Sequence, residues 1–253
     1  MSVHHFKQAS AYHATGSELP RNFPDGAIFA LSEGEHVYLC GPELDAISEV
    51  SEVHKRAEIA LRDFYVALKL VQPNLEAMNI GRVVLEDDDG QRKVFVLVHG
   101  SSHARGRSKT TAVLTVNTSR PEEAGPTQAQ QILAVMKQTE RLRTAAQIVS
   151  DPDSSWPHIH RAYEEVERFV REKRELGLVD AQLCSRAELQ RFKQSANSPE
   201  VAGKDSRHAL GGPIPPPGKP MALAEARAFV SKMLKAALQM NLEEQSKAEQ
   251  PLG

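Results

Sequence analysis

Residues 43–71 read ELDAISEVSEVHKRAEIALRDFYVALKLV. Apolar side chains recur there at every third or fourth position, which places them on one face of an α-helix. Glu43 and Asp45 favour the positive end of the helix dipole, and the preceding Pro42 suits a first turn. Pro73 ends the pattern. The stretch therefore predicts one long helix whose apolar face must cover another element.

Short apolar runs on both sides of this helix predict a β-sheet for it to cover. They are AIFAL (27–31), HVYLC (36–40), VVL (83–85), VFVLV (94–98) and TTAVLTVN (110–117). The first two are joined by a connection that contains Gly34, and the next two flank Asp89-Gly90, a strong hairpin signal. We expect four or five strands in a small, mostly antiparallel sheet with the helix on one face.

Beyond Pro121 the patterns are helical. Helical periodicity covers residues 128–150, 156–176, 186–194 and 223–240. Ser185 and Glu188 have the spacing of a capping box at the start of the third stretch. Mixed charges along the second stretch predict i,i+4 ion pairs on a solvated face. The predicted fold class is α+β, a small mostly antiparallel sheet with a long covering helix, followed by a helical C-terminal half.

Four regions follow from these patterns. We expect an N-terminal arm at 1–25, an α+β region at 26–120, a helical region at 125–243 and a disordered tail at 244–253. The arm is polar and punctuated by glycine and proline, so we interpret it as mobile chain or as an extended strap. The two halves form either separate domains or one continuous core.

The composition limits the classes of function. The 253 residues are 40% hydrophobic and 25% charged with a net charge of −2, so no general field attracts nucleic acid or anionic membranes. No segment approaches the ~20 apolar residues of a membrane span, and the N-terminus carries no signal-peptide pattern. Cys40 and Cys184 belong to no CxxC pair. We expect reduced thiols, a cytoplasmic location and no cofactor.

The connection at 99–109 is the first candidate site. It is rich in glycine and serine and carries Arg105, Arg107 and Lys109. Backbone N–H groups beside such cations suit a phosphate, although the spacing of a P-loop is absent. The alternative, which we favour, is a solvated loop whose charges keep the sheet edge from pairing with other chains.

Two histidine pairs and an acidic run are weaker candidates for a metal site. His99 and His103 stand four residues apart, and His158 and His160 stand two apart. Metal sites use such spacings, but no nearby cysteine or carboxylate completes a set. Residues 86–90 lack the ligand order of a calcium loop. We therefore expect surface histidines, a charged hairpin turn and no metal.

Residues 195–220, SANSPEVAGKDSRHALGGPIPPPGKP, form the most unusual segment. A stretch this long and this rich in proline and glycine is usually functional or disordered. Within it, Arg207 places a permanent cation beside His208, a group that titrates near neutrality.

Because this Arg and His stand close to the last helices, residues 125–243 resemble the HEPN domains of bacterial defence and toxin–antitoxin systems. In that family an Arg and a His, usually four to six residues apart, cleave RNA in a dimer cleft, whereas Arg207 and His208 are adjacent. The resemblance implies an RNA-associated protein with these two as catalytic residues. The residues alone favour another role, in which both hold the loop by hydrogen bonds to backbone carbonyls.

No nucleophile elbow, dinucleotide fingerprint, HExxH or kinase motif is present. We predict a non-enzymatic bacterial interaction or regulatory protein that presents its sheet edge or its proline-rich segment to a protein partner. A homodimer through the amphipathic helices at 43–71 and 223–240 is the other expected assembly. The alternative function is that of a HEPN-like nuclease, in which the cations of the 99–109 loop and the Arg207–His208 pair converge on one cleft.

Overall fold

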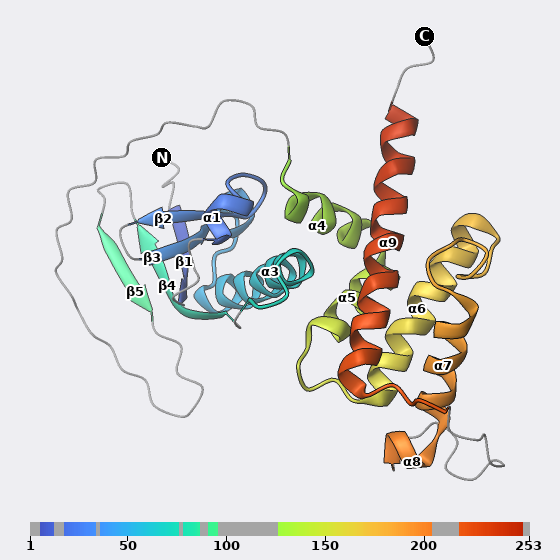
Figure 1. Cartoon of the computed structure of the whole chain (residues 1–253). Coiled ribbons are helices and arrows are strands. Elements are labelled where there is room, and N and C mark those ends of the chain that lie inside the picture. The colour runs from blue at the N-terminus through green and yellow to red at the C-terminus, as the bar shows by residue number, and fades with distance from the viewer. Residues whose placement is uncertain are drawn as a thin grey trace. The chain divides into compact units, whose positions relative to one another are not determined.

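The computed structural model describes residues 6–12, 18–33, 36–75, 78–86, 91–95, 126–203 and 218–249. The chain divides into two compact units, residues 1–130 and residues 131–253. In Figure 1 the first contains the strands and α3, and the second contains the helices from α5 to α9. We call them the sheet unit and the helical unit. The boundary falls within α4, Gln128–Gln138.

The described strands of the sheet unit form one antiparallel sheet in the order β2-β3-β1-β4-β5. Their bounds are β1 Phe6–Tyr12, β2 Phe29–Glu33, β3 His36–Cys40, β4 Asn79–Glu86 and β5 Arg92–Phe95. Both predicted hairpins are confirmed, β2 with β3 and β4 with β5. The predicted strand at 110–117 lies outside the described residues.

The N-terminal stretch that the sequence predicts as an arm supplies the central strand instead. Ala9 of β1 lies opposite Leu39 of β3 on one side and opposite Val83 of β4 on the other. A short helix, α1 Glu18–Asn22, follows. The alternative of mobile chain is wrong for residues 6–12, because backbone pairing from both sides determines the conformation of a segment whose local β propensity is weak.

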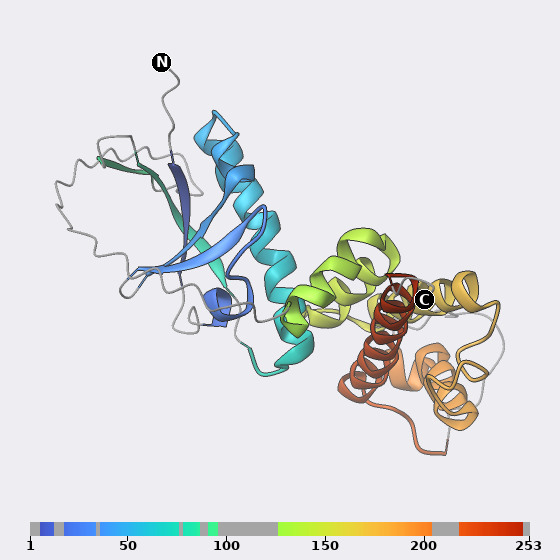
Figure 2. The same ribbon diagram turned by 90° about the horizontal axis from the view of Figure 1, so that it is seen from above.

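The long helix covers one face of the sheet, as predicted, but it begins later than expected. It is α3, Val50–Val71, and it packs against β4 and β1 (Figure 2). Residues 42–45 form a separate short helix, α2 Pro42–Asp45, so the prediction of one helix from residue 43 is wrong at its first turn. The chain bends at Gly41, immediately before this short helix. The position requires glycine, because φ is 135° and a Cβ there would overlap the Ala27 carbonyl.

The core of the sheet unit joins α3 to the chain that follows α1. The rings of Phe23 and Phe64 stack with centroids 4.1 Å apart and planes 9° apart. Val53, Ala57 and Leu68, which share the apolar face of α3 with Phe64, are fully buried. This face is the one that the sequence periodicity predicts.

The helical unit contains the remainder of α4 and the helices that follow. They are α5 Glu140–Ser150, α6 Trp156–Arg174, α7 Arg186–Asn197, α8 Pro199–Ala202 and α9 Leu223–Glu249. The α6 helix packs against α5, α7 and α9. The predicted helix at 128–150 is interrupted at Thr139, whose backbone is extended (φ −132°, ψ 95°). The α+β fold with a helical C-terminal half is therefore as predicted.

The predicted disordered tail at 244–253 is wrong for residues 244–249, which belong to α9. These residues are good helix formers, and two of them are tied to neighbouring helices. Glu244 pairs with Arg174 of α6, and the Gln245 amide donates to Gln138 of α4 at 2.6 Å. Such contacts hold a polar helix end that sequence hydrophobicity alone does not predict.

An aromatic cluster centred on Phe192 forms much of the helical core. Trp156, Tyr163 and Phe229 surround this ring, with centroids 5.3–6.4 Å away. His160 also stacks on Phe192 and is only 8% exposed, so the prediction of a surface histidine is wrong there. A histidine one helical turn from Tyr163 shares the buried face of α6.

Candidate functional site: a groove on the helical unit

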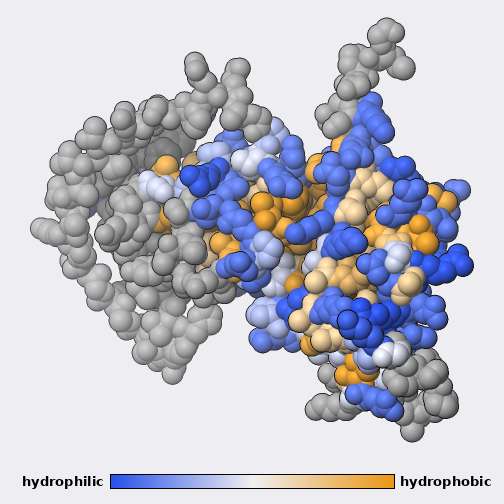
Figure 3. Space-filling view, in the orientation of Figure 1, coloured by the Kyte–Doolittle hydropathy of each residue, from blue (hydrophilic) through white to orange (hydrophobic). Residues whose placement is uncertain are grey.

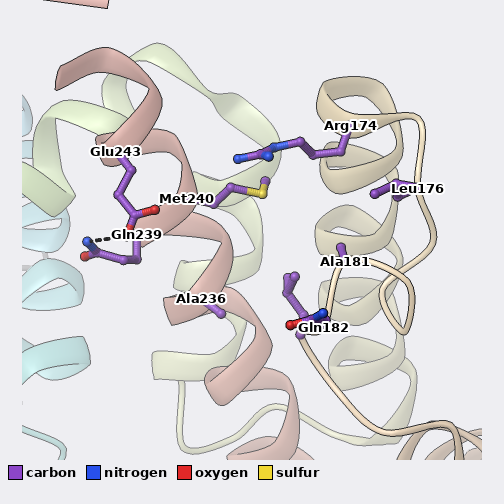
Figure 4. A pocket seen from close by; sticks show the side chains of 9 residues that line it. Arg174, Leu176, Ala181, Gln182, Ala236, Gln239, Met240 and Glu243 are labelled. Carbon is purple, nitrogen blue, oxygen red and sulfur yellow. Dashed lines mark hydrogen bonds between the residues drawn. The ribbon is translucent and has the colours of Figure 1, made fainter. Parts of the chain in front are cut away.

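An open groove of about 320 Å³ lies between α9 and the chain that links α6 to α7 (Figure 4). We call residues 175–184 the groove segment. The lining residues come from α6, the groove segment and α9, namely Arg174, Leu176, Ala181, Gln182, Leu183, Ala236, Gln239, Met240 and Glu243. Figure 3 shows apolar patches among hydrophilic ones on this unit. The lining of the groove itself mixes apolar and polar side chains.

The groove segment is fixed to the unit at several points. Leu178, Leu183 and Cys184 are buried, and they anchor the segment on its inner side. Its backbone closes on itself through hydrogen bonds from the Ala181 and Leu183 amides to Gly177 and Leu178, both at 2.9 Å. A connection held in this way has few accessible conformations, so its outer side chains keep their places.

Strained backbone brackets the groove segment. Glu175 has φ 55° and Gln182 has φ 62°, and no other described residue except glycine has a positive φ. The left-handed region costs an L-residue about 1–2 kcal/mol, so each persists because its surroundings determine it. Such strain tends to cluster at binding and catalytic sites. Both residues lie beside or in the groove wall.

Leu176 is the most exposed large hydrophobic side chain among the described residues, at 44%. It stands next to the strained Glu175 and lines the groove opposite α9. Ala236 and Met240 of α9 are half-buried on the other side. An apolar side chain kept in water by a rigid wall is available to contact another molecule.

An ion pair closes one end of the groove. Arg174 Nε lies 2.7 Å from Glu244 Oε1, so the pair joins α6 to α9. On α9, the Gln239 amide donates to Glu243 at 3.2 Å (Figure 4). Arg174 and Glu244 are both partly exposed, so an incoming charged group can replace one partner at little cost.

A second hollow of about 330 Å³ lies on the far side of this ion pair, because Glu244 lines it while Arg174 lines the groove. Its walls are polar and are formed by Gln138, Thr139, Lys173, Asn241, Glu244 and Gln245. The Gln245 amide donates to both Gln138 and Asn241, at 2.6 Å and 2.8 Å. The hollow therefore offers carboxamides and charges rather than apolar surface.

Charged residues of α6 form ion pairs with neighbouring helices. The sequence predicts a different arrangement, with i,i+4 pairs along one solvated face of α6. Arg141 of α5 binds Glu165 at 3.0 Å and Glu172 at 2.8 Å. Lys193 of α7 lies 3.8 Å from Glu167. The prediction of a wet, charged face holds only in part, because these pairs fix the neighbours of α6.

Tyr163 and Cys184 carry the buried polar chemistry near the groove segment. The Tyr163 hydroxyl donates to Glu167 at 2.5 Å, and burial raises the pKa of this phenol well above its ordinary value. Burial also raises the pKa of the Cys184 thiol. A raised thiol pKa disfavours the thiolate, the form that attacks substrates or binds metals. Neither described cysteine is in a disulfide, as predicted.

The residues of both predicted sites lie outside the described residues. This applies to Arg105, Arg107 and Lys109, and also to Arg207 and His208. His99, His103 and most of the acidic turn at 86–90 lie outside them as well. The structure therefore describes no cleft in which these groups meet. His158 is described, and its Nδ1 accepts a hydrogen bond from the Ser155 amide at the start of α6.

Arg191, which no motif in the sequence singles out, holds the described end of the proline-rich segment. Its guanidinium donates to the carbonyls of Lys219 and Pro220 at 2.6 Å and 3.1 Å. It also forms a bidentate pair with Glu225 in the first turn of α9. The amide of Met221 donates to the buried Ser195 hydroxyl at 2.9 Å. The sequence signal was an Arg and an acidic helix start on either side of a long loop.

The described residues contain no cluster of three or more His, Cys, Asp or Glu side chains placed to hold a metal ion. Within the same part of the chain, every helix is too short or too polar to span a bilayer.

Comparison with known proteins gave no match to a family model, to a curated protein or to a solved structure.

Proposed function

We propose that this chain is a non-enzymatic interaction protein and that its helical unit binds another protein in the groove. The observation that carries the proposal is the exposed Leu176 on a strained and anchored wall. A monomeric protein gains nothing for its own stability from keeping this side chain in water. A binding role accounts for both the exposure and the strain.

The chemistry of the groove supports a protein partner. Interfaces between proteins combine a desolvated apolar centre with a polar rim. Here Leu176, Ala236 and Met240 supply apolar surface, and Gln182 and Glu243 supply hydrogen-bonding groups around it. Because the groove segment is already ordered, a partner does not have to order it on binding, and the entropic cost of association is small.

Capture of partners on three purified forms of the full chain tests the proposal. Leu176→Glu places a charge on the groove wall. Leu31→Glu is a matched control, because Leu31 is 41% exposed on β2 of the sheet unit. We expect wild type and Leu31→Glu to retain the same protein and Leu176→Glu to lose it. Mass spectrometry identifies that protein, and its purified form allows the affinities to be measured directly.

The same proteins bound to all three forms, or no protein bound to wild type, would exclude the groove as a binding site. A weaker affinity for Leu176→Glu with an unchanged melting temperature would support it. The thermal measurement separates a lost contact from a damaged fold.

The RNA-associated alternative stays a prediction, because Arg207 and His208 lie outside the described residues. A protein that neutralises phosphates loses affinity steeply as salt rises, with a slope of about −0.7 per phosphate for single strands. On the interaction proposal we expect purified protein at low salt to show neither salt-dependent binding nor cleavage of single-stranded RNA.

A further inference from the structure

The second hollow contains a buried amide group with an unused donor. Asn241 of α9 lines this hollow and is only 5% exposed. Its carboxamide oxygen accepts a hydrogen bond from the Gln245 amide at 2.8 Å, whereas its NH2 group has no hydrogen-bond partner among the described residues. A polar group held this far from bulk water is costly unless it is hydrogen-bonded. The NH2 group therefore needs a partner that enters the hollow, either water or a ligand.

The carboxamide that carries this donor is held in place. The Gln245 amide donates to Gln138 of α4 at 2.6 Å as well as to Asn241, so one side chain ties α4 to α9. Because Gln245 holds the oxygen of Asn241, the nitrogen lies on the other side of the carboxamide from Gln245. A donor fixed before a ligand arrives keeps the entropic cost of binding small.

A helix begins at the wall of the same hollow. Thr139 lines the hollow and is the N-cap residue of α5, but its side chain caps none of the first amides of that helix. The first turn of a helix has N–H groups without intrahelical partners, and the helix dipole favours negative charge there. This end of α5 adds backbone donors to the NH2 group of Asn241, and both kinds of donor suit an anion.

The charges around the hollow leave one cation over. Glu244 pairs with Arg174 at 2.7 Å, and Glu140 at the start of α5 pairs with Arg143 at 3.7 Å. Lys173 lines the hollow, is exposed, and has no ion-pair partner in the part of the chain that the structure describes. One unpaired lysine balances one negative charge, so a carboxylate group fits better than a phosphate group, whose charge approaches −2 at neutral pH.

We propose that the second hollow binds the carboxylate group of a small polar molecule. Lys173 supplies the opposite charge, and the NH2 group of Asn241 and the first amides of α5 supply hydrogen bonds. The volume of about 330 Å³ admits a small molecule, and the amide-rich walls favour one that is polar beyond its carboxylate. The site is distinct from the groove, so this inference does not depend on the proposed function.

Titration of the full chain with sodium acetate tests the inference, with nuclear magnetic resonance of 15N-labelled protein at pH 7 and constant ionic strength as the measurement. We expect saturable shifts of the side-chain NH2 signals of Asn241 and of the backbone amides of residues 140–142. The dissociation constant should be in the millimolar range, because acetate has few atoms with which to make contacts. Inorganic phosphate, titrated in the same way, should bind more weakly.

Three variants connect the shifts to the site. Lys173→Gln should weaken acetate binding by about twofold to fivefold, because it removes one exposed charge. Lys235→Gln is the matched control, since Lys235 is an exposed lysine of α9 that does not line the hollow, and it should leave the constant unchanged. Asn241→Asp replaces the NH2 group by a negatively charged oxygen of the same shape, and it should abolish binding.

Shifts that remain linear in acetate concentration, or that occur only outside the hollow, overturn the inference. Equal weakening by Lys173→Gln and Lys235→Gln does so as well, because it would show a general effect of charge. Tighter binding of phosphate than of acetate excludes a carboxylate as the ligand group. The amide spectrum of each variant shows whether it is folded, and if Asn241→Asp is not, the comparison of the two lysine variants decides.

Discussion

Glu175 occupies a position where helices usually place glycine. Its amide donates to the Arg171 carbonyl at 2.9 Å, which closes the last turn of α6, and its backbone is left-handed. Glycine adopts this conformation without the steric cost that a Cβ imposes. At the scale of one residue, replacing Glu175 by glycine should therefore stabilise the protein.

We expect Glu175→Gly to raise the free energy of unfolding by about 0.5–1 kcal/mol. The gain is the relief of left-handed strain, reduced by the greater chain entropy that glycine has in the unfolded state. Urea unfolding followed by circular dichroism measures the change. The control is Glu175→Ala, which removes the carboxylate but keeps Cβ, and which should leave stability nearly unchanged.

Equal stabilisation by alanine and glycine would show that the carboxylate of Glu175, and not its left-handed backbone, destabilises the wild-type fold. A loss of stability on Glu175→Gly would show that the glutamate side chain contributes more than its backbone costs.

At the scale of the element, the start of α7 is the clearest agreement between sequence and structure. The Glu188 amide donates to the Ser185 hydroxyl at 3.1 Å, and the Ser185 amide donates to the Glu188 carboxylate at 3.0 Å. This is the reciprocal capping box that the spacing predicts. The hydrogen bonds from Ser185 hold the pKa of Glu188 below its ordinary value.

This cap should make α7 sensitive to acid. A carboxyl group whose pKa is lowered in the folded state stabilises the fold above its unfolded pKa of about 4.3, and the contribution is lost as the pH falls through the folded pKa. We expect the stability difference between wild type and Glu188→Gln to be largest near pH 7 and to shrink on acidification to pH 3. Chemical unfolding at a series of pH values measures it.

Ser185→Ala provides the control for the cap. Without the serine hydroxyl, the effect of Glu188→Gln should vary less with pH. A difference that is constant from pH 7 to pH 3 in the wild-type background would contradict the assignment.

Local elements were predictable, and elements that depend on distant chain were not. The two hairpins and the α7 cap are encoded within a few residues of themselves. By contrast, β1 is a strand because it pairs with β3 and β4, and the end of α9 is ordered by contacts with Arg174 and Gln138. No local pattern reports such contacts.

The candidate site likewise depends on contacts between distant parts of the chain, so the sequence did not predict it. Leu176 is a single apolar residue just after the polar end of α6, and the sequence around it does not distinguish an exposed leucine from a buried one. The groove exists because α9 passes beside the groove segment, and the strain at Gln182 appears only in the folded backbone. The sequence indicated charged loops instead, because it shows which side chains carry charge but not where the fold places them.

At the scale of the whole molecule, each unit has its own core. Phe192 is the centre of the aromatic cluster in the helical unit, and Phe64 stacks on Phe23 in the sheet unit. We expect Phe192→Leu to lower hydrogen-exchange protection in α5, α6, α7 and α9 by about 1–3 kcal/mol, through loss of buried ring contacts. Protection of the strands and α3 should change much less. Hydrogen exchange with peptide-level mass spectrometry measures both.

The matched variant is Phe64→Leu, which should produce the reverse pattern. If either variant lowered protection in both units to the same extent, the chain would unfold as one cooperative body, and the division into two units would have no energetic meaning.

The central position of β1 has a consequence for synthesis. The ribosome releases this strand before either of its neighbours exists. Roughly 80 residues separate Phe6 from its register partner Glu86, so at ~5–20 residues per second the strand waits for several seconds. For the later part of that interval only β3 is available to pair with it, and its other edge can pair with another polypeptide. The nascent protein is therefore most exposed to misassembly until translation has delivered β4.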